Sequence, residues 1–455
     1  MAARPLATVS ALAACSSPPE DDREPAPTAM TTSGSVRGVE QDGIRRFLGI
    51  PYAAPPLGER RWQPPQPASP WTGIRDATAA EPVCAQPEAP DMPADTPRSE
   101  DCLPLEVTAP ADGGAGRPVM VWLPGGGFVT GAGSIHDPTR LVEAGDVVVV
   151  TVNYRLGVFG FFAHSELGND SNFGLQDQAA AVRWVRDNIA ELGGDPAQVT
   201  LAGASAGGMS ACTLMTSPAA EGLFQRAIVH SGSCLTGHPA GAIGEGVDAI
   251  SSWHPISTIQ GTGQALAEEL SCPDVACLRE KPADELLPYT MMSPLVAYGT
   301  DLVPAEPARA FAEGSQAAVP LLRGNARDEH VEFILTAYPE GITTDQYSEL
   351  LDIAFDQAAS DVERRYPVGD FPSPTAAASR VFSDRDWICP TRESARHLRT
   401  RGADLRLRLH RPLSAAPPAG SHSPGTFDPP PHTEQRSATC STSPTTQNPP
   451  PSNSP

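Results

Sequence analysis

The sequence predicts an α/β layered fold, in which a mostly parallel central sheet is flanked by helices. Two short, β-branched apolar segments, Val119–Leu123 and Asp146–Asn153, have the composition of buried strands. A helical pattern at Phe173–Leu192 follows them, a pair of glycines ends it, and a third strand is expected at Val199–Ala202. Strands that alternate with helices along a chain are typical of a parallel sheet with helices on its faces.

The first 35 residues differ in composition from the centre of the chain. Arg4 precedes a short apolar run that ends in small residues, which is the pattern of an export signal. The run Leu-Ala-Ala-Cys that ends at Cys15 resembles a bacterial lipobox, in which Cys15 carries the lipid, and the rest of residues 1–35 would be a flexible tether. The alternative is an alanine-rich terminus with an incidental cysteine. A single acyl chain binds membranes only marginally, so a stable anchor would need more than one.

The last 45 residues also differ, so the globular domain is expected at residues 36–410. Residues 411–455 hold 12 prolines and 14 serines or threonines, with almost no apolar periodicity. Such a segment cannot bury enough apolar surface to offset the entropy of ordering it, and we expect disorder. The composition is also that of GC-rich codons read out of frame. A divergent tail and a shifted reading frame both stay open.

The charge of the chain limits its partners. It has 54 acidic and 32 basic residues among 455, which gives a net charge of −22. Such a surface repels a duplex, so no nucleic-acid partner is expected. No window of 18 consecutive apolar residues occurs, so no spanning helix is predicted. The sequence does not indicate an oligomeric state.

A nucleophile is predicted at Ser205. The pattern Gly-Ala-Ser-Ala-Gly at 203–207 follows the expected strand Val199–Ala202 and precedes a helical pattern, which is the context that G-x-S-x-G requires. The sharp turn leaves no room for side chains at its glycines and lifts the Ser205 hydroxyl above the sheet edge. The alternative is an ordinary glycine-rich connection between a strand and a helix.

An oxyanion hole is predicted from a second glycine-rich segment. The strand Val119–Leu123 runs through Pro124 into three glycines, about 80 residues before Ser205. Backbone N–H groups can converge on one point only where no side chains intervene, so Gly126, Gly127 and Ala206 would hold the developing oxyanion. The alternative is a flexible turn.

Together these stretches resemble the type-B carboxylesterase family of α/β-hydrolases, which includes bacterial esterases and cholinesterases. The matching segments are FLGIPYAAPPLGERRW (47–62), SEDCL (99–103), VMVWLPGGGF (119–128), VTVNYRLGVFGFF (150–162), NFGLQDQAAAVRWVRDNIAELGGDPAQVTLAGASAGG (172–208) and IVHSGS (228–233). The resemblance covers about residues 40–400. It implies the α/β-hydrolase fold and hydrolysis of small carboxylic esters through an acyl-serine intermediate, with no cofactor and no metal.

The sequence departs from the family pattern at three positions. The family often has glutamate before the nucleophile, where this chain has Ala204, which argues against a preference for choline esters. The glycine run usually follows histidine or tyrosine, and here it follows Pro124. The third departure is His330, where the family has glycine.

The resemblance implies that Glu329 is the acid of a catalytic triad. Residues 319–330 form an apolar strand and a polar turn that match the family's G-x-N-x-D-E-G segment, in which the glutamate orients the catalytic histidine. Serine, acid and histidine follow one another in this order along the chain in this fold. Without the resemblance, Glu329 would be read as a solvated turn acid.

The catalytic base is harder to assign. Chain order leaves the histidines after Glu329, which are His330, His397, His410, His422 and His432. His330 adjoins the acid and cannot easily face it, and His397 lies in an arginine-rich helical stretch. His432 lies nearest in the sequence to the position at which family members carry the catalytic histidine, although the residues around it do not match the family pattern. The family pattern fits to about residue 403 and then stops, and the chain ends before the family's further helices, so the C-terminal part of the fold is expected to be incomplete.

The resemblance also implies disulfides, which fit an exported, extracellular or surface-anchored protein. Family members carry disulfides at the positions of Cys84–Cys102 and Cys272–Cys277. A metal half-site at the second pair is disfavoured, because no second ligand pair exists. Cys212 is expected in the core, and no partner is assigned to Cys234, Cys389 or Cys440.

The sequence therefore predicts a serine carboxylic ester hydrolase. The alternatives are a family member that is inactive because its C-terminal part is damaged or because it serves in surface interaction, and another acyl hydrolase such as an amidase or lactonase. The acyl and alcohol groups of the substrate are not indicated by any residue in the chain.

Overall fold

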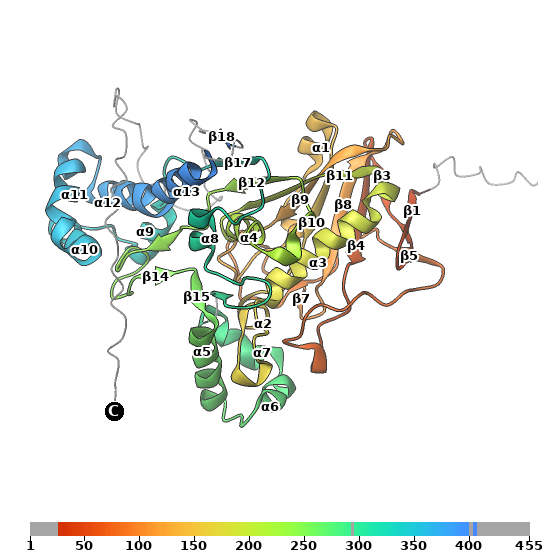
Figure 1. Ribbon diagram of the computed structural model, residues 1–455, viewed down its shortest axis with the longest axis horizontal. Helices are drawn as coiled ribbons and strands as arrows, with labels where there is room; N and C mark the ends of the chain where they lie inside the picture. The colour runs from red at the N-terminus through yellow and green to blue at the C-terminus, as the bar shows by residue number, and fades with distance from the viewer. Residues whose placement is uncertain (1–25, 293–294, 400–403, 407–455) are drawn as a thin grey trace, which may run out of the picture.

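The computed structural model describes residues 26–292, 295–399 and 404–406 (Figure 1). Its largest sheet, among these residues, has nine strands. In spatial order they are β18 (Asp404–Arg406), β17 (Leu321–Gly324), β12 (Arg226–His230), β11 (Gly194–Ala204), β9 (Arg117–Leu123), β10 (Val148–Val152), β8 (Pro104–Pro110), β4 (Ile44–Pro51) and β3 (Val39–Gln41). The three strands predicted from the sequence are confirmed as β9, β10 and β11.

The sheet is parallel from β18 to β10 and antiparallel from β10 to β3. The register aligns Leu123 with Gly203, Ala204 with His230, and His230 with Gly324. The carboxyl ends of β9, β11, β12 and β17 therefore meet at one edge, where an open α/β sheet places its ligand site.

Helices cover both faces of this sheet. On one face lie α3 (Phe173–Asn188) and α4 (Ala206–Leu214), whose apolar residues share one core cluster with Val148 and Val150 of β10. Val149 points the other way and packs in a separate cluster with Val142 of α1 (Thr139–Gly145). Helix α3 and the 3₁₀ turn after it confirm the predicted helix, and Gly193 ends the turn at a positive φ of 94°.

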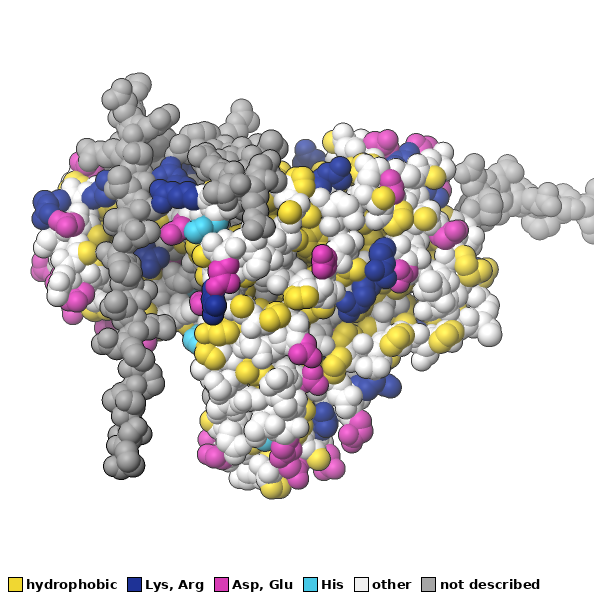
Figure 2. All heavy atoms as spheres, in the orientation of Figure 1, with side chains coloured by type: hydrophobic (Ala, Val, Ile, Leu, Met, Phe, Trp, Pro, Cys, Tyr) yellow, Lys and Arg dark blue, Asp and Glu magenta, His cyan; other side chains and the backbone are white. Residues whose placement is uncertain are grey.

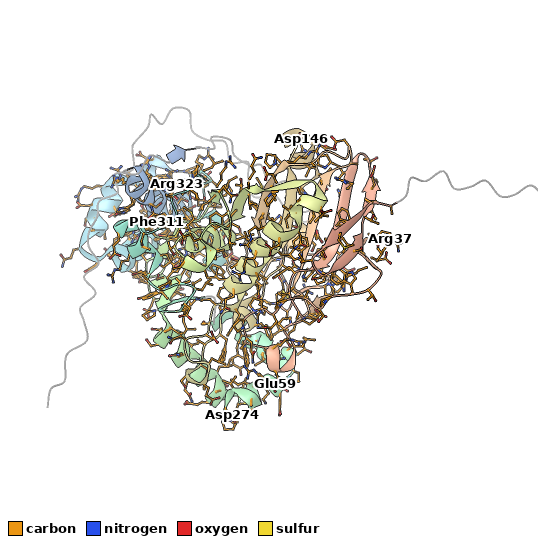
Figure 3. All side chains as sticks on the ribbon, turned by 45° about the vertical axis from the view of Figure 1, so that its right-hand side comes forward. Arg37, Glu59, Asp146, Asp274, Phe311 and Arg323 are labelled. Carbon is orange, nitrogen blue, oxygen red and sulfur yellow. A yellow bond between two sulfur atoms is a disulfide. The ribbon has the colours of Figure 1, made fainter. Side chains whose placement is uncertain are left out.

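A group of helices below the sheet in Figure 1 forms a second core. It contains α2 (Gly157–Phe161), α5 (Ile256–Glu269), α6 (Val275–Glu280) and α7 (Ala283–Leu286), and the strands β15 (Trp253–Pro255) and β16 (Val296–Tyr298) pair above it. Figure 3 shows Glu59 beside this group, close to Asp274 at the start of α6.

A third core lies at the left of Figure 1, where helices follow strand β17 in the chain. Helix α8 (Pro307–Glu313) precedes β17, and its Phe311 packs in the main core cluster. The helices after β17 are α9 (Val331–Ala337), α10 (Thr344–Phe355), α11 (Ala359–Arg365), α12 (Pro374–Phe382) and α13 (Cys389–Arg399). A π-helical turn, Ser383–Ile388, joins the last two. The pair β13 (Gly237–His238) and β14 (Ile250–Ser251) lies on the sheet side of this group.

The expected start of the domain at residue 36 is wrong. Strand β1 (Thr28–Thr31) pairs along its length with β2 (Gly34–Arg37), which also pairs with β5 (Ile74–Asp76). Residues 28–35 therefore belong to the folded domain, because backbone pairing to a distant strand holds them. The expected export signal with Cys15, and the tail at 411–455 with His432, lie outside the described residues.

Three disulfides link described cysteines. Two of them, Cys84–Cys102 and Cys272–Cys277, are the pairs that the family resemblance implies. The third is Cys212–Cys234, which the sequence did not predict. Cys212 is buried in the core, as expected, and it is the partner of Cys234. Parallel pairing of β11 and β12 brings the segments that follow them together, so two cysteines 22 residues apart approach to a Cα–Cα distance of 5.6 Å.

The surface mixes charges of both signs. On the face shown in Figure 2, acidic and basic side chains of the described residues alternate with apolar and polar ones, and no continuous basic stripe crosses it. Among the described residues, no helix has the length and apolar character needed to cross a bilayer.

Candidate active site

Ser205 occupies a strained turn between β11 and α4. Its φ is 53° and its ψ is −122°, a conformation that side-chain-bearing residues rarely adopt. The Ser205 N–H donates to the His230 carbonyl at 2.9 Å, and the Ser205 carbonyl accepts from Met209 N–H at 2.8 Å. One bond to the neighbouring strand and one to the first turn of α4 thus fix the backbone of the nucleophile candidate.

The two glycines of the motif are required by close backbone approach. A Cβ on Gly203 would lie 2.4 Å from the Gly207 carbonyl carbon, and one on Gly207 would lie 2.0 Å from the Leu123 carbonyl oxygen. Neither obstacle is the end of a flexible side chain, so neither can move aside. The sequence reasoning that only glycine fits this turn is therefore correct for both positions.

The glycine run after β9 lies directly against Ser205. A Cβ on Gly125 would be 2.9 Å from the Ala204 carbonyl oxygen and 3.2 Å from the Ser205 Cβ. Gly126 has a φ of 112° and Gly127 a φ of 62°, so the loop turns sharply at these residues. The pairing of β9 with β11 produces this contact, because both strands end at the same level of the sheet.

Buried hydrogen bonds hold both ends of the glycine loop. The Tyr154 hydroxyl donates to the Pro124 carbonyl at 2.9 Å, and burial raises the pKa of Tyr154, which keeps it protonated. At the other end, the Gln86 amide donates to the Gly131 carbonyl and accepts from its N–H, at 3.0 and 2.8 Å. The loop is therefore fixed before any substrate arrives.

The N–H groups of Gly126, Gly127 and Ala206 have no hydrogen-bond acceptor among the residues that the structure describes. Ala206 is the first residue of α4, where the N–H has no acceptor within the helix. Unsatisfied N–H donors of this kind can stabilise a developing negative charge, so all three remain candidates for an oxyanion hole.

Glu329 follows β17 at the same edge of the sheet. Its carboxylate accepts from the Ala326 N–H at 2.7 Å and is partly buried, which distinguishes it from a fully solvated turn acid. Arg323, which is labelled in Figure 3, marks the carboxyl end of β17 from which the Glu329 turn begins. Strand β18 pairs in parallel with β17, so the chain that leaves β18 also starts from this edge.

A buried ion pair joins the segment after β10 to helix α3. Arg155 donates to both carboxylate oxygens of Asp177 in α3, at 2.8 and 2.7 Å, and its backbone N–H adds a third bond at 3.1 Å. Both side chains are almost fully buried. Burial raises the pKa of Asp177, and the Arg155 charge opposes that shift.

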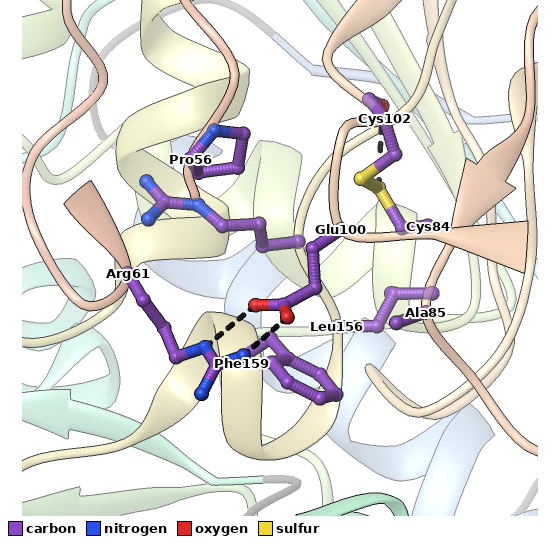
Figure 4. Close-up of a pocket in the computed structure, with 9 residues that line it drawn as sticks. Pro56, Arg61, Cys84, Ala85, Glu100, Cys102, Leu156 and Phe159 are labelled. Carbon is purple, nitrogen blue, oxygen red and sulfur yellow. Dashed lines mark hydrogen bonds and ion pairs between the residues drawn. A yellow bond between two sulfur atoms is a disulfide. The ribbon is translucent and has the colours of Figure 1, made fainter. Parts of the chain in front are cut away.

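A small pocket lies beside the Cys84–Cys102 disulfide, and Arg155 is among the residues that line it (Figure 4). Arg61 and Glu100 form a buried, two-bond ion pair there. The Arg61 guanidinium also donates to the backbone carbonyls of Leu278, Arg279 and Lys281. The residues that line the pocket include neither Ser205 nor Glu329, and the pair acts as a clamp between the N-terminal loops and α6.

Sequence reasoning missed one group of polar side chains. His238, His330 and Asp386 bring their ligand-type atoms within 4.8 Å of one another. The only sequence signal was His330, noted as a departure from the family glycine. Asp386 lies 148 positions from His238, and no spacing rule connects them.

A comparison with protein families gives one decisive match. The model of the carboxylesterase family matches residues 25–404. The chain belongs to the carboxylesterase family.

The curated relatives of this carboxylesterase-family chain are named as esterases. It is 40% identical over 315 residues to the para-nitrobenzyl esterase of Bacillus subtilis (strain 168), covering 66% of this chain and 62% of the relative. It is 41% identical over 323 residues to human carboxylesterase 3, covering 66% and 54%. It is 37% identical over 381 residues to the fumonisin B1 esterase of Sphingopyxis macrogoltabida, covering 78% and 66%. The chain thus spans between about half and two thirds of the length of these relatives.

Solved structures agree with this assignment. A thermophilic para-nitrobenzyl esterase superposes with a TM-score of 0.71 at 32% identity, over 84% of this chain and 79% of that one. Another para-nitrobenzyl esterase structure gives 0.68 at 32% identity with the same coverage. The carboxylesterase-family chain has the α/β-hydrolase fold, as the sequence predicts.

Proposed function

We propose that the chain hydrolyses carboxylic esters through an acyl-serine intermediate, with Ser205 as the nucleophile. The observation that carries the proposal is the backbone of Ser205. It is held at a positive φ between β11 and α4, with the glycine run packed against it. The adjoining segments carry the N–H groups of Gly126, Gly127 and Ala206, which have no acceptor among the described residues.

In the first half of the reaction, the Ser205 oxygen attacks the ester carbonyl carbon and its proton passes to a histidine. The carbonyl oxygen becomes an oxyanion, which the N–H groups of Gly126, Gly127 and Ala206 stabilise. The C–O bond to the alcohol then breaks, and the histidine returns the proton to the leaving alcohol. Water repeats these steps on the acyl-serine and releases the carboxylic acid.

Glu329 is the proposed acid, which orients the histidine and stabilises its imidazolium form. His432 is the proposed base, because it follows both Ser205 and Glu329 and is the nearest by position to the family histidine. Support for the assignment comes from β18, whose last residue lies at the sheet edge that carries Ser205 and Glu329.

We propose in addition that the protein is exported and carries a lipid on Cys15. The three disulfides support an oxidising compartment, since such bonds are rare in the cytosol. Labelled palmitate fed to a bacterial host tests the anchor. Label on the wild type and none on Cys15→Ala is expected, and an unlabelled wild type would contradict it.

The experiment for the enzyme is the hydrolysis of p-nitrophenyl butyrate by the purified full chain. Ser205→Ala is expected to lower kcat by about 10⁶, because the reaction then has no nucleophile. The matched control is Ser210→Ala in the same helix, whose hydroxyl accepts from Gln178 and faces the core, and it is expected to retain activity. A wild type no faster than Ser205→Ala would overturn the proposal.

The base is tested in the same assay with two variants of the same segment. His432→Ala is expected to lose activity to a similar degree, because a triad acts as a unit. His422→Ala is the control and is expected to keep it. If Ser205→Ala is inactive and His432→Ala is not, the nucleophile stands and the assignment of the base is wrong.

A further inference from the structure

Three polar side chains from distant parts of the chain meet between the sheet and the helical end of the molecule. His238 lies in β13, His330 precedes α9, and Asp386 lies in the π-helical turn Ser383–Ile388. We propose that His238, His330 and Asp386 bind a divalent transition-metal ion, with Zn²⁺ as the best fit. Neither the proposed catalytic residues nor the disulfides include any member of this metal site.

The distances between the ligand atoms suit such an ion. Nδ1 of His238 lies 2.9 Å from Oδ2 of Asp386, and Nδ1 of His330 lies 3.7 Å from the same oxygen. An ion at about 2.0–2.1 Å from each ligand in tetrahedral geometry spaces them by about 3.4 Å. Small adjustments therefore suffice, and the protein supplies three ligands of the kind that zinc and other first-row metals accept.

The tautomer of His330 is set in the way that a ligand needs. Its Nε2 lies 2.7 Å from the Ala242 carbonyl, which can only accept, so Nε2 carries the proton. Burial lowers the pKa of His330 and keeps the ring neutral. The Nδ1 lone pair then faces Asp386. Metal-bound histidines usually donate their second N–H to a carbonyl or carboxylate in this way.

Asp386 has an oxygen that nothing in the described protein satisfies. Its side chain is fully buried, and Oδ1 has no hydrogen-bond partner among the described residues. Arg380, in the helix that precedes this turn, pairs with Asp384 and not with Asp386. A buried carboxylate with one unsatisfied oxygen is costly, and a bound cation removes that cost. The π-helical turn that carries Asp386 is a feature often found at functional sites.

Among the described residues of the site, His238 has the side chain that is not fully buried. Aromatic rings of Phe333, Phe382 and Trp387 pack against the two histidines. The side chain of His238 is 13% exposed, so an ion enters past this ring. Two contacts must open. The 2.9 Å hydrogen bond between Nδ1 of His238 and Oδ2 of Asp386 gives way to the ion, with the His238 proton on Nε2. The Trp387 indole N–H, which donates to Nδ1 of His330 at 3.3 Å, must move away. The bond from Trp387 is long and therefore weak, so it competes poorly with a metal ion for the lone pair of His330 Nδ1.

The test is calorimetric titration of the full chain with ZnCl₂ after removal of bound metal with EDTA. We expect one ion per chain with a Kd of about 1 μM or tighter. Excess Zn²⁺ should raise Tm by a few degrees, because the ion binds only the folded state. With Co²⁺ as the probe, visible absorption bands should appear and saturate at one equivalent.

Variants assign the binding to these residues. His238→Gln and Asp386→Asn should each weaken Zn²⁺ binding by about 100-fold or more and abolish the Tm rise. The control is His254→Gln, a partly buried histidine whose ring bonds to the Ser251 carbonyl, and it should bind as the wild type does. If Asp386→Asn does not fold, His238→Gln decides, because that ring lies at the edge of the cluster.

Two results would overturn the site. One is a wild type that binds no Zn²⁺ at 100-fold molar excess, which would leave the cluster as a buried ion pair between His238 and Asp386. The other is binding that His238→Gln does not weaken, which would place the ion elsewhere, for example on the histidines of the tail. Neither result depends on esterase activity, so the proposed function stands or fails separately.

Discussion

Two regions of this molecule are tightly constrained, and the constraints differ in kind. At the edge of the sheet, Ser205 is held by backbone, with Gly203, Gly207 and Gly125 excluding any side chain around it. At the helical end, His238, His330 and Asp386 are held by their own side chains, which bond to one another and to a carbonyl. The first region tolerates no added atom, whereas the second lacks a partner for one buried oxygen.

The difference teaches how each region can be recognised. Where backbone atoms leave no room for side chains, the sequence carries a short, contiguous pattern, because the residues that form the turn must be glycine. A side-chain cluster leaves none, because its members come from segments that only the fold brings together. If this contrast is right, an atom added to the turn around Ser205 should be costly. Loss of the buried Arg155–Asp177 pair should likewise cost more than loss of an exposed pair.

Gly207→Ala is expected to lower both stability and activity. The new Cβ would lie 2.0 Å from the Leu123 carbonyl oxygen, so the elbow cannot close around Ser205. We expect a loss of stability of about 3 kcal/mol and a fall in kcat/KM of more than about 10³. Denaturant unfolding and the p-nitrophenyl butyrate assay measure the two.

The control for that variant is Gly261→Ala in α5, where a Cβ would meet nothing within 4 Å. It should be neutral or stabilise the protein by up to about 1 kcal/mol, because alanine is the better helix former. Equal effects of the two variants would mean that close approach does not explain the glycine at 207.

Asp177→Ala should cost about 3–5 kcal/mol of stability, because it leaves the Arg155 guanidinium buried without its partner. Asp187→Ala is the control in the same helix. Its pair with Arg186 is about half exposed on both sides and should be worth less than about 1 kcal/mol. Urea unfolding of both variants measures the free energy of unfolding. A similar small loss in each would contradict the stabilisation that we assign to the buried pair.

The two glycines of the proposed oxyanion hole should differ. Gly126→Ala places a Cβ 2.2 Å from the Thr130 carbonyl oxygen at a φ of 112°, so the loop must move and kcat should fall by about 10²–10³. Gly127→Ala meets nothing within 4 Å and has a φ of 62°, which alanine adopts at a cost of about 1–2 kcal/mol. Its kcat should fall less, and a reversed order would argue against this loop geometry.

The last comparison concerns two disulfides, whose removal affects stability alone. Replacing Cys212 and Cys234 by alanine opens a loop with a sequence separation of 22, and should cost about 3 kcal/mol in the chain-entropy model. The same change at Cys272 and Cys277, with a separation of 5, should cost about 2 kcal/mol. Thermal unfolding under non-reducing conditions ranks them, and a greater loss from the shorter loop would show that entropy is not the main term.

Much of the fold could be read from local patterns. The strands at β9, β10 and β11 and the helix α3 were predicted because their apolar residues recur at the period of the element they form. The position of the turn around Ser205 was predicted because its strand, its glycines and its helix follow one another directly in the sequence. Roles for Glu329 and for the two predicted disulfides came from the family resemblance, since an acid in a turn carries no signature of its own.

Other features could not be read in this way. The domain starts before residue 36 because Thr28–Thr31 pairs with a neighbouring strand, and such short polar strands look like linker. Cys212 was placed in the core, where it is, but its bond to Cys234 depends on how β11 and β12 lie side by side. The cluster of His238, His330 and Asp386 depends on how helices after β17 fold back over β13.

The sequence by itself determined the layered fold, the strand–turn–helix around Ser205 and the glycine loop after β9. Each is a local arrangement in which only a few residue types fit without a steric clash. Only the tertiary structure decided that the loop lies against Ser205, that Arg155 meets Asp177, and that two histidines surround a buried carboxylate. These are contacts across long stretches of chain. Their energies depend on burial and on the partner's position, and neither is written in the order of the residues.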